Sequence, residues 1–236
     1  MRYRRKHKGK ILIIILLIAI LGYSAVANIK TNLNDSPITV LQNLIDIHST
    51  ADTDHGWNLI LVNRDYYIPK DYEVELTELS NGEKVDSRIY PDLQEMFDDA
   101  RAEGFQLFVA DGYRTEETQQ RILDEKIEAY KNEGYSNSEA EKKAKVWVAI
   151  PGTSEHQLGI AVDINADTTR SSSEEVYNWL AQNAYKYGFI KRYPSDKTEI
   201  TGVINEPWHY RYVGREAAQE IYSQNVCLEE YIQSLE

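Results

Sequence analysis

Cysteine is almost absent from this 236-residue chain, which contains only Cys227. A single cysteine excludes an internal disulfide framework and any zinc finger built from several cysteines. Basic residues are also scarce beyond residues 1–30, a stretch that holds seven Lys and Arg and no acid. Residues 31–236 carry 19 basic and 38 acidic side chains, a balance of −19. A body with that charge repels phosphate backbones, so nucleic-acid binding is excluded.

Long apolar runs are rare, with one exception near the start of the chain. The run Ile11–Leu21 follows a cluster of Lys and Arg residues, and the stretch continues with small residues to Ala27. A helix of this length would be about 26 Å long, the lower limit for crossing a bilayer. The basic cluster is expected to stay cytoplasmic, which places the rest of the chain outside the membrane. We predict a basic N-terminus and single transmembrane anchor over 1–29; alternatively, the segment is a secretory signal cleaved near Ala27.

Two further regions follow the hydrophobic segment. Residues 30–55 are rich in Asn, Asp, Ser and Thr and carry little apolar periodicity, so a stalk or linker is predicted there. Residues 56–236 have the length of one folded domain. With 42% hydrophobic and 27% charged residues overall, the chain has the composition of a globular protein.

The body mixes helical and strand patterns without strict alternation, which predicts an α+β fold. Apolar residues recur at helical spacing in several segments, and Ser136 with Glu139 forms a capping box. Short apolar runs bounded by glycine or turn residues predict strands. The predicted helices cover residues 91–103, 115–132, 136–148, 171–187 and the C-terminal region, and the predicted strands cover 59–62, 106–110, 160–164 and 210–213.

The predicted domain keeps two histidines, His156 and His209, and each lies near a carboxylate in the sequence. Strand alternation from residue 160 to 164 places Asp163 on the face opposite the apolar residues, where core packing does not explain a carboxylate. Gly159 could let the preceding loop fold back so that His156 meets Asp163. The second histidine ends the segment Glu206-Pro207-Trp208-His209, in which the proline keeps Glu206 out of helical geometry.

Two histidines and one carboxylate form a three-ligand set typical of catalytic zinc, with a fourth position open for water. Glu206 would then be a carboxylate that does not bind the metal and acts as general base on the bound water. The alternative is that each histidine and carboxylate pair is structural. Spacing alone leaves that alternative open.

A third segment, Asp111-Gly112-Tyr113-Arg114-Thr115, joins a predicted strand to a predicted helix. Arg114 at such a junction can present a bidentate fork to a carboxylate. Gln119 lies just over one helical turn further on and could reach the same ligand. Alternatively, Arg114 pairs with one of the many surface acids, an interaction that would contribute little.

Together these segments resemble the zinc D-alanyl-D-alanine carboxypeptidases, and in particular the VanY type associated with vancomycin resistance. The resemblance extends over nearly all of the predicted domain. Many relatives have Ser where this chain has Asp111, and a carboxylate at that position could shift the affinity for a substrate that is itself a carboxylate. The motifs that carry the resemblance are Ser154-x-His156-x-x-Gly159-x-Ala161-x-Asp163, Glu206-x-Trp208-His209, Asp111-Gly112-Tyr113-Arg114, and the flanking stretches 57–64, 78–83 and 227–231.

The resemblance implies a fold of the hedgehog and D-Ala-D-Ala-peptidase kind, with a small antiparallel sheet flanked by helices. It also implies one Zn²⁺ per chain. The residue roles that it implies are zinc ligation by His156, Asp163 and His209, general-base catalysis by Glu206, binding of the substrate's terminal carboxylate by Arg114, and placement of the scissile bond by Gln119 and Ser154.

The implied activity is removal of the C-terminal D-Ala from peptidoglycan stem pentapeptides or their precursors, with a role in cell-wall remodelling and glycopeptide resistance. The expected partners are these stem peptides and, through the N-terminal helix, the membrane; no obligate protein partner is implied. Two alternatives remain, an L,D-carboxypeptidase acting on tetrapeptide stems and a non-catalytic, zinc-containing wall-binding domain. A serine-type carboxypeptidase is excluded, because the sequence contains neither Ser-x-x-Lys nor Lys-Thr-Gly.

Overall fold

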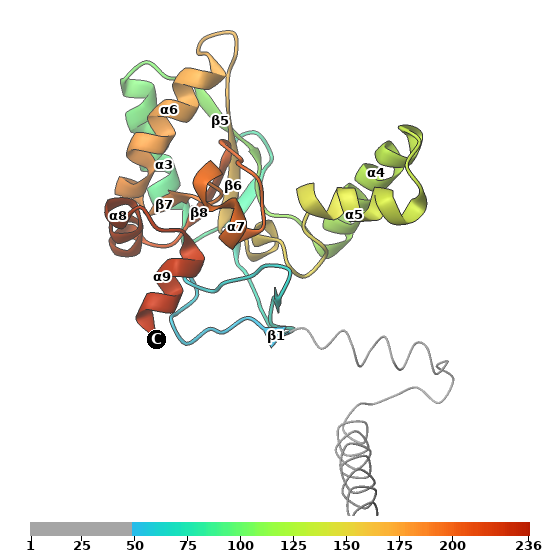
Figure 1. Cartoon of the computed structure of the whole chain (residues 1–236). Coiled ribbons are helices and arrows are strands. Elements are labelled where there is room, and N and C mark those ends of the chain that lie inside the picture. Colours follow the sequence, from blue (N-terminus) through green and yellow to red (C-terminus); the bar gives the residue numbers. More distant parts are fainter. Residues whose placement is uncertain (1–48) are drawn as a thin grey trace, which may run out of the picture. The chain divides into compact units, whose positions relative to one another are not determined.

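A computed structural model of the chain describes residues 49–236 (Figure 1). The predicted anchor over 1–29, and the predicted stalk up to residue 48, lie outside the described residues. Within the described part, no helix is both long and apolar enough to cross a membrane. The short strand β1 (Ser49–Thr50) pairs in parallel with β2 (Tyr66–Tyr67), so the last residues of the predicted stalk contact the folded body.

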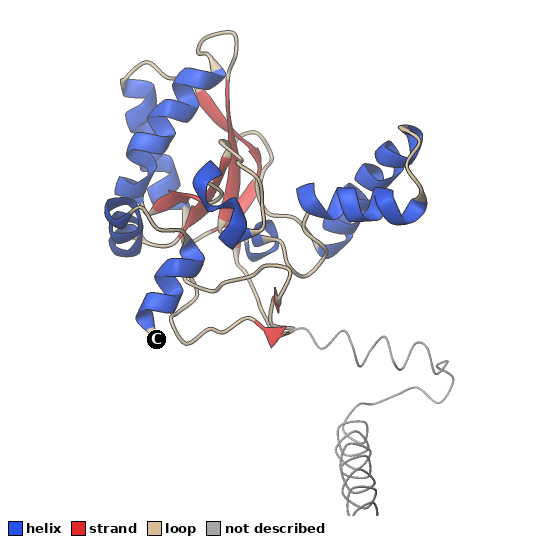
Figure 2. Ribbon diagram, in the orientation of Figure 1, coloured by secondary structure: helices blue, strands red, loops and turns tan. Residues whose placement is uncertain are grey.

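The centre of the body is a four-stranded antiparallel sheet with helices on its flanks (Figure 2), which confirms the predicted α+β class. Its strand order is β5-β6-β8-β7, and a small separate sheet pairs β3 with β4. The elements beyond β1 and β2 are β3 (Leu76–Glu78), β4 (Lys84–Asp86), α3 (Tyr90–Ala102), β5 (Leu107–Asp111), α4 (Glu116–Asn132), α5 (Asn137–Trp147), the 3-10 helix η1 (Glu155–Leu158), β6 (Ala161–Ala166), α6 (Ser173–Asn183), η2 (Ala184–Tyr187), β7 (Phe189–Lys191), η3 (Ser195–Lys197), α7 (Thr198–Thr201), β8 (His209–Tyr212), α8 (Arg215–Gln224) and α9 (Leu228–Leu235).

The two faces of the central sheet differ in chemistry. On β6, Val162 and Ile164 belong to the main hydrophobic core, together with residues of α3 and α6. Successive strand residues alternate between faces, so Asp163 points away from that core. His209 is the direct partner of Asp163 in the β6–β8 ladder, and it therefore shares the polar face. The alternation predicted from the sequence is confirmed, and it brings two of the three predicted metal ligands together.

A β-bulge adds a third polar residue to this face. The register between β5 and β6 shifts between Val109 and Asp111, so that Asp111 lies opposite Asp163. Val109 packs in the core, and without the bulge Asp111 would follow it to the same side. Bulges commonly re-aim a side chain beside a functional site. Here the bulge turns the end of β5 toward the predicted metal ligands.

The predicted helices are confirmed to within a few residues. Helix α5 begins with the predicted capping box, in which the Ser136 hydroxyl accepts from the Glu139 amide and the Glu139 carboxylate accepts from the Ser136 amide. Helix α6 is capped by Ser172 and ends at Asn183, where a 3-10 turn replaces the last turn of the predicted helix. Helices α4 and α5 form a hairpin that projects from the body (Figure 1).

The strand predicted over residues 59–62 is wrong, because this apolar segment has no strand pairing. Ile60 and Val62 are nevertheless buried, as their hydrophobicity requires. The backbone oxygens of Asn58 and Ile60 accept hydrogen bonds from the buried guanidinium of Arg211 at 3.1 and 2.8 Å. A side chain thus satisfies the polar backbone that a neighbouring strand would otherwise pair with.

Candidate active site

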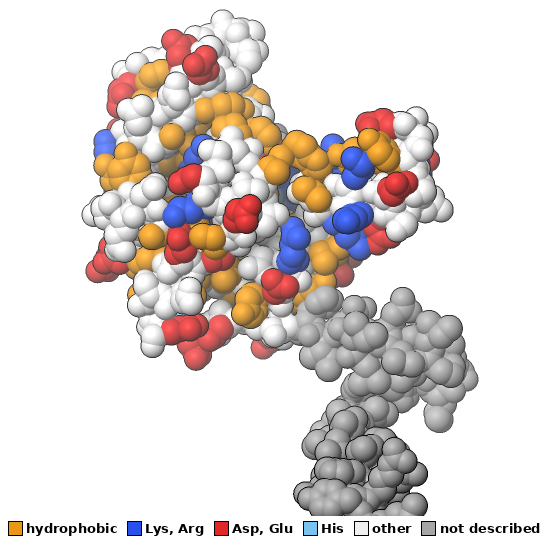
Figure 3. Space-filling view, in the orientation of Figure 1, with side chains coloured by type: hydrophobic (Ala, Val, Ile, Leu, Met, Phe, Trp, Pro, Cys, Tyr) orange, Lys and Arg blue, Asp and Glu red, His pale blue; other side chains and the backbone are white. Residues whose placement is uncertain are grey.

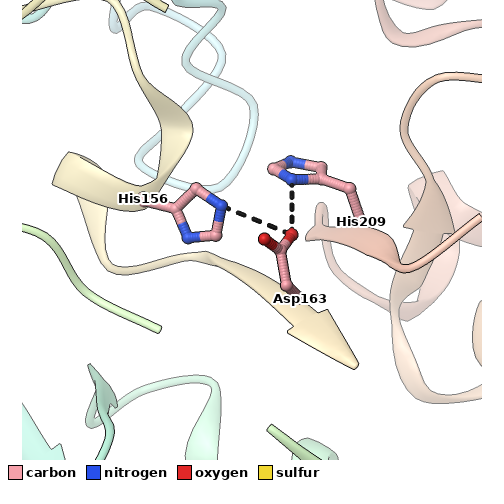
Figure 4. Close-up of side chains that lie close together, drawn as sticks. All are labelled: His156, Asp163 and His209. Atoms are coloured by element: carbon pink, nitrogen blue, oxygen red, sulfur yellow. Dashed lines mark hydrogen bonds and ion pairs between the residues drawn. The ribbon is translucent and has the colours of Figure 1, made fainter. Parts of the chain in front are cut away.

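The three predicted metal ligands converge on the polar face of the sheet (Figure 4). Nε2 of His156 lies 3.5 Å from Oδ1 of Asp163, and Nδ1 of His209 lies 3.0 Å from the same oxygen. One ligand atom from each of the three side chains lies within 4.8 Å of the other two. The two rings are 4.9 Å apart and nearly perpendicular. The arrangement is that of a three-ligand metal site.

The remaining nitrogen of each ring is held by a hydrogen-bond acceptor. Nδ1 of His156 lies 2.7 Å from the carbonyl oxygen of Gly112, and Nε2 of His209 lies 3.4 Å from the carboxylate of Glu155. The Gly112 carbonyl cannot donate, so Nδ1 of His156 carries a proton and, in the neutral ring, its Nε2 faces Asp163 with a lone pair. Both nitrogens of His209 face carboxylates, which favours a ring protonated on both nitrogens in the absence of a metal ion. Such partners commonly orient metal-binding histidines.

Two glycines permit this packing. Gly159 follows η1 with a φ of +74°, a left-handed conformation that lets the chain turn from His156 into β6. The predicted fold-back of this loop is confirmed. Gly112 approaches β4 so closely that a Cβ atom would lie 2.2 Å from the Lys84 carbonyl oxygen. Only glycine can therefore bring this carbonyl group to His156.

The electrostatics of the site favour a bound cation. Burial alone would raise the pKa of Asp163, but the two neighbouring imidazoles outweigh it and hold this pKa below its usual value. Burial would lower the pKa of His209, yet the hydrogen bonds to Asp163 and Glu155 raise it to about 9. Without a metal ion, His209 therefore holds a proton at neutral pH, and a metal ion must displace that proton.

A buried ion-pair network supports His209 from behind. One oxygen of Glu155 accepts from Arg192 at 2.7 Å and from Arg211 at 2.9 Å, while the other faces His209. Arg192 in turn forms a two-pronged pair with Glu229 of α9, at 2.6 and 2.9 Å. Glu155, Arg192 and Arg211 are each at most 1% exposed. The network fixes the ring orientation of a metal ligand.

Glu206 lies beside the ligands without being one of the three. Its carboxylate is 3.9 Å from Nδ1 of His209 and 14% exposed. The backbone turn is fixed at both ends, because the Glu206 amide donates to Tyr193 and its carbonyl accepts from the His209 amide. Burial raises the pKa of Glu206, and His209 offsets this only in part. A carboxylate with a raised pKa beside a metal site is suited to accept and return a proton.

Arg114 reaches the site from the end of β5, and the alternative prediction that it pairs with an acid is the one the structure shows. Its Nε and Nη2 donate to Asp111 at 2.9–3.1 Å, so it does pair with an acid. It also lies 3.5 Å from the second oxygen of Asp163 and lines the same cleft as Glu206. Gln119 is fully buried; its side-chain oxygen accepts from Arg114 and its nitrogen donates to the Ala149 carbonyl. In this structure Gln119 contacts Arg114 and holds it in place.

The three predicted ligands, Glu206 and Arg114 line one cleft of about 420 Å³, whereas the fully buried Gln119 is not part of its lining. Ser154 lines it and is 4% exposed. The sequence analysis did not predict a role for the four residues of the buried network that supports the site, which are Glu155, Arg192, Arg211 and Glu229. One sequence feature could have indicated this network: Arg211 is a charged residue between Tyr210 and Tyr212 in a predicted strand, which is unusual. Its partners lie up to 153 residues away, so no local pattern indicates them.

An open three-ligand metal site with a buried carboxylate and a guanidinium in the same cleft, on an α+β scaffold, is typical of a metal-dependent hydrolase. The family model for VanY, D-alanyl-D-alanine carboxypeptidase, matches residues 82–215. The chain belongs to this family. A D-alanyl-D-alanine carboxypeptidase of Enterococcus faecalis (strain ATCC 700802 / V583) is 63% identical over 176 residues, which cover 75% of this chain and 66% of that protein. The match thus spans just under two thirds of that relative's length.

Solved structures of related proteins share the fold. VanYB in complex with D-alanine-D-alanine superposes with a TM-score of 0.75 at 62% identity, covering 76% of this chain and 99% of that chain. A mutant of the vancomycin resistance D,D-pentapeptidase VanY from a VanB-type resistance cassette, in complex with Zn(II), gives 0.73 at 63% identity, covering 75% and 99%. The LD-carboxypeptidase LdcB gives 0.63 at 38% identity, covering 73% and 84%.

Proposed function

We propose that this chain is a zinc-dependent D,D-carboxypeptidase that removes the C-terminal D-Ala from peptidoglycan stem peptides ending in D-Ala-D-Ala. The observation that carries the proposal is the convergence of three kinds of group in one cleft. These are the ligand trio centred on Asp163, the non-ligand carboxylate of Glu206 and the guanidinium of Arg114. Family membership and the likeness to a D-Ala-D-Ala complex support the same reaction.

The donor set fits zinc. Two imidazoles and one carboxylate, each ring with its second nitrogen bonded to an oxygen, would hold the ion through His156, Asp163 and His209. When bound, zinc polarises a carbonyl group and lowers the pKa of a coordinated water to about 7. A closely similar protein has been solved in complex with Zn(II).

Glu206 would transfer the proton, and Arg114 would bind the substrate. The Glu206 carboxylate takes a proton from the attacking water and returns it to the departing D-Ala amine, a reversible role that suits its raised pKa. Arg114 binds the substrate's terminal carboxylate, which fixes cleavage one residue from the end. Gln119 positions Arg114, and Ser154 in the cleft wall helps to place the scissile bond.

Removal of one D-Ala would destroy the D-Ala-D-Ala end that glycopeptide antibiotics bind. The reaction would therefore contribute to glycopeptide resistance and limit cross-linking of the wall. The relative solved with Zn(II) is a vancomycin resistance D,D-pentapeptidase from a VanB-type resistance cassette, which supports this role.

The test is a mass-spectrometric assay of the full-length chain, in detergent, with a synthetic pentapeptide ending in D-Ala-D-Ala. We expect loss of one alanine, abolished by a chelator and restored by Zn²⁺. Asp163→Ala should lose both zinc and turnover. If the wild-type chain binds zinc and releases no alanine from either the pentapeptide or a tetrapeptide stem, the non-catalytic wall-binding alternative replaces this proposal.

A second candidate is L,D-carboxypeptidase activity on tetrapeptide stems. The observation that favours it is the likeness to the LD-carboxypeptidase LdcB at 38% identity. The same zinc site, base and arginine would serve either bond. Parallel assays with a pentapeptide and a tetrapeptide separate the two, because a D,D-carboxypeptidase stops at the tetrapeptide and an L,D-carboxypeptidase continues to the tripeptide.

We also propose that the catalytic domain lies outside the membrane and is tethered by the helix predicted over residues 1–29. The basic cluster and apolar run near the start of the chain support this location. Membrane fractionation with protease treatment of whole cells tests it. Release of a shortened chain into the medium would show instead that the segment is cleaved near Ala27.

A further inference from the structure

The active-site cleft carries a charge that contrasts with the rest of the protein. Its lining includes five cationic side chains and three acidic ones, whereas residues 31–236 hold twice as many acids as bases. The three acids, Glu155, Asp163 and Glu206, all belong to the metal site and its support. Beyond them, the charged groups along the cleft are cations: Arg64, Arg114, Lys126, Lys145 and Arg192.

Two of these cations have no acidic partner in the part of the chain that the structure describes. Arg192 pairs with Glu155 and Glu229, Arg114 with Asp111, and Lys145 with Glu141. Among the described residues, neither Lys126 nor Arg64 has a carboxylate oxygen within 4.0 Å of its charged nitrogens. Arg64 donates to the Gly202 carbonyl at 2.9 Å, which uses part of its guanidinium. Unpaired cations in an acidic protein are a prepared site for an anion.

Lys126 is held in place by aromatic rings. Its Nζ lies 5.3 Å from the ring centroids of both Tyr130 and Trp147, within the range of cation–π attraction. Trp147 ends α5 and is 45% exposed, so it offers a flat apolar surface beside the ammonium group. Figure 3 shows Lys and Arg side chains next to hydrophobic ones along the hollow beside the α4–α5 hairpin. A peptide backbone with an acidic substituent matches this surface.

The position of Lys126 on α4 sets the distance from the reaction site. Gln119, which holds Arg114, lies seven residues earlier, and seven residues are close to two helical turns, so both share one face. The two positions are about 10 Å apart along the axis. An extended peptide covers about 10 Å in three residues. If Arg114 binds the C-terminal carboxylate, a chain running along α4 brings the third residue before the end to Lys126.

We propose that Lys126 and Arg64 bind an anionic group of the substrate located about three residues before its C-terminus, while Trp147 packs against the intervening peptide. In a stem pentapeptide this is the second residue, whose free carboxylate supplies the charge. The diphosphate of a precursor carrier is also anionic, but it is attached beyond the first residue, further from the C-terminus than this spacing. This inference rests on the proposed function, because it uses Arg114 as the anchor of the terminal carboxylate.

The test compares three pentapeptides ending in D-Ala-D-Ala with the full-length, zinc-loaded enzyme. The first has a free carboxylate on its second residue, the second has an amide there, and the third is the amide peptide joined to a nucleotide diphosphate. For each enzyme variant, kcat/KM is measured on all three, and the ratio of each anionic substrate to the amide substrate is the readout. We expect Lys126→Gln and Arg64→Gln each to lower the first of these two kcat/KM ratios, that of the free-carboxylate substrate to the amide substrate, by about two- to fivefold.

The salt dependence of the ratios and a matched control variant test whether the effect is electrostatic and specific to the cleft. The ratio should fall toward one in the wild type as salt rises from about 0.05 to about 0.5 M, because screening weakens exposed charge pairs. Lys131→Gln is the control, since Lys131 lies on α4 outside the cleft and pairs with Glu128. Its ratios should equal those of the wild type. A ratio that falls only for the diphosphate substrate would place the anion further from the C-terminus and overturn the proposal.

The proposal is overturned if the wild type cleaves all three substrates and Lys126→Gln and Arg64→Gln leave both ratios unchanged. Failure of the proposed function looks different, because the wild type would then release alanine from none of them. Zinc content and the unfolding midpoint of each variant confirm that a changed ratio does not arise from a damaged site.

Discussion

At the scale of the residue, Glu206 separates metal binding from proton transfer. It lies 3.9 Å from His209 and outside the ligand trio. Glu206→Gln should therefore retain stoichiometric zinc while kcat falls by about 10² to 10⁴-fold, the usual contribution of a general acid–base residue. Metal analysis and steady-state kinetics on the same sample check this. Turnover close to the wild-type value would remove Glu206 from the mechanism.

Asp111 pairs with the guanidinium of Arg114, to which the proposed mechanism assigns the terminal carboxylate of the substrate. Its carboxylate occupies the Nε and Nη2 donors of Arg114. A substrate carboxylate must compete with it, so Asp111→Ser should lower KM for D-Ala-D-Ala peptides by about three- to tenfold with little change in kcat. The matched control is Asp98→Asn, at an exposed acid that pairs with Arg101. A raised KM would mean that Asp111 orients Arg114 instead.

At the scale of the element, η1 connects the metal site to the rest of the fold. Its first residue, Glu155, is the shared partner of two buried arginines that come from the ends of β7 and from β8. Removing Glu155 leaves Arg192 with only Glu229 and leaves the buried Arg211 without a carboxylate partner among the described residues. Glu155→Ala should lower the free energy of unfolding by about 3–5 kcal/mol. Denaturant titration in the presence of a chelator measures this without the contribution of zinc.

A matched control separates this effect from the loss of any acid. Glu174 lies exposed in the first turn of α6, and Glu174→Ala should change the free energy of unfolding by at most about 0.5 kcal/mol. The Glu155 variant should also bind zinc more weakly, because His209 loses the partner that orients its ring. Equal stability of the two variants would show that the network contributes little.

Local patterns were sufficient to predict the elements that carry the site. Capping residues and periodicity located α3 to α6, and motif spacing located the trio around Asp163. What they missed depends on distant partners. The segment from residue 59 to 62 looks like a strand, but the carbonyl group of Ile60 accepts a hydrogen bond from Arg211, about 150 residues later. Likewise, the role of Glu155 was not predicted although it lies within the first motif, because that role depends on two arginines 37 and 56 residues away.

At the scale of the whole molecule, the sheet separates stability from chemistry. One face, with Val162 and Ile164, packs against α3 and α6 and forms the main core. The opposite face holds Asp163 and His209 and opens to the cleft beside the α4–α5 hairpin. Because β6 and β8 lie in the middle of the sheet order, two of the three ligands, Asp163 and His209, sit on its central strands, while His156 lies on η1. A rigid scaffold of this kind keeps ligand atoms in place before the metal binds.

Zinc should therefore stabilise the whole fold, and by an amount that depends on pH. The pKa of His209 is raised from 6.5 to about 9 without metal. The stability contributed by its protonated form is present in full below about pH 6.5 and is lost as the pH rises through 9. Zinc requires the neutral ring, so a proton competes with zinc across this range.

The expected result is a difference in unfolding midpoint between zinc-saturated and chelated protein that grows from about pH 6.5 to about pH 8.5. Free zinc a thousandfold above Kd stabilises the native state by about 4 kcal/mol, so the shift is readily measured. Differential scanning fluorimetry at fixed free zinc across this pH range checks it, and Asp163→Ala, which should bind no zinc, is the control. A difference that shrinks as the pH rises would show that His209 does not release a proton when zinc binds.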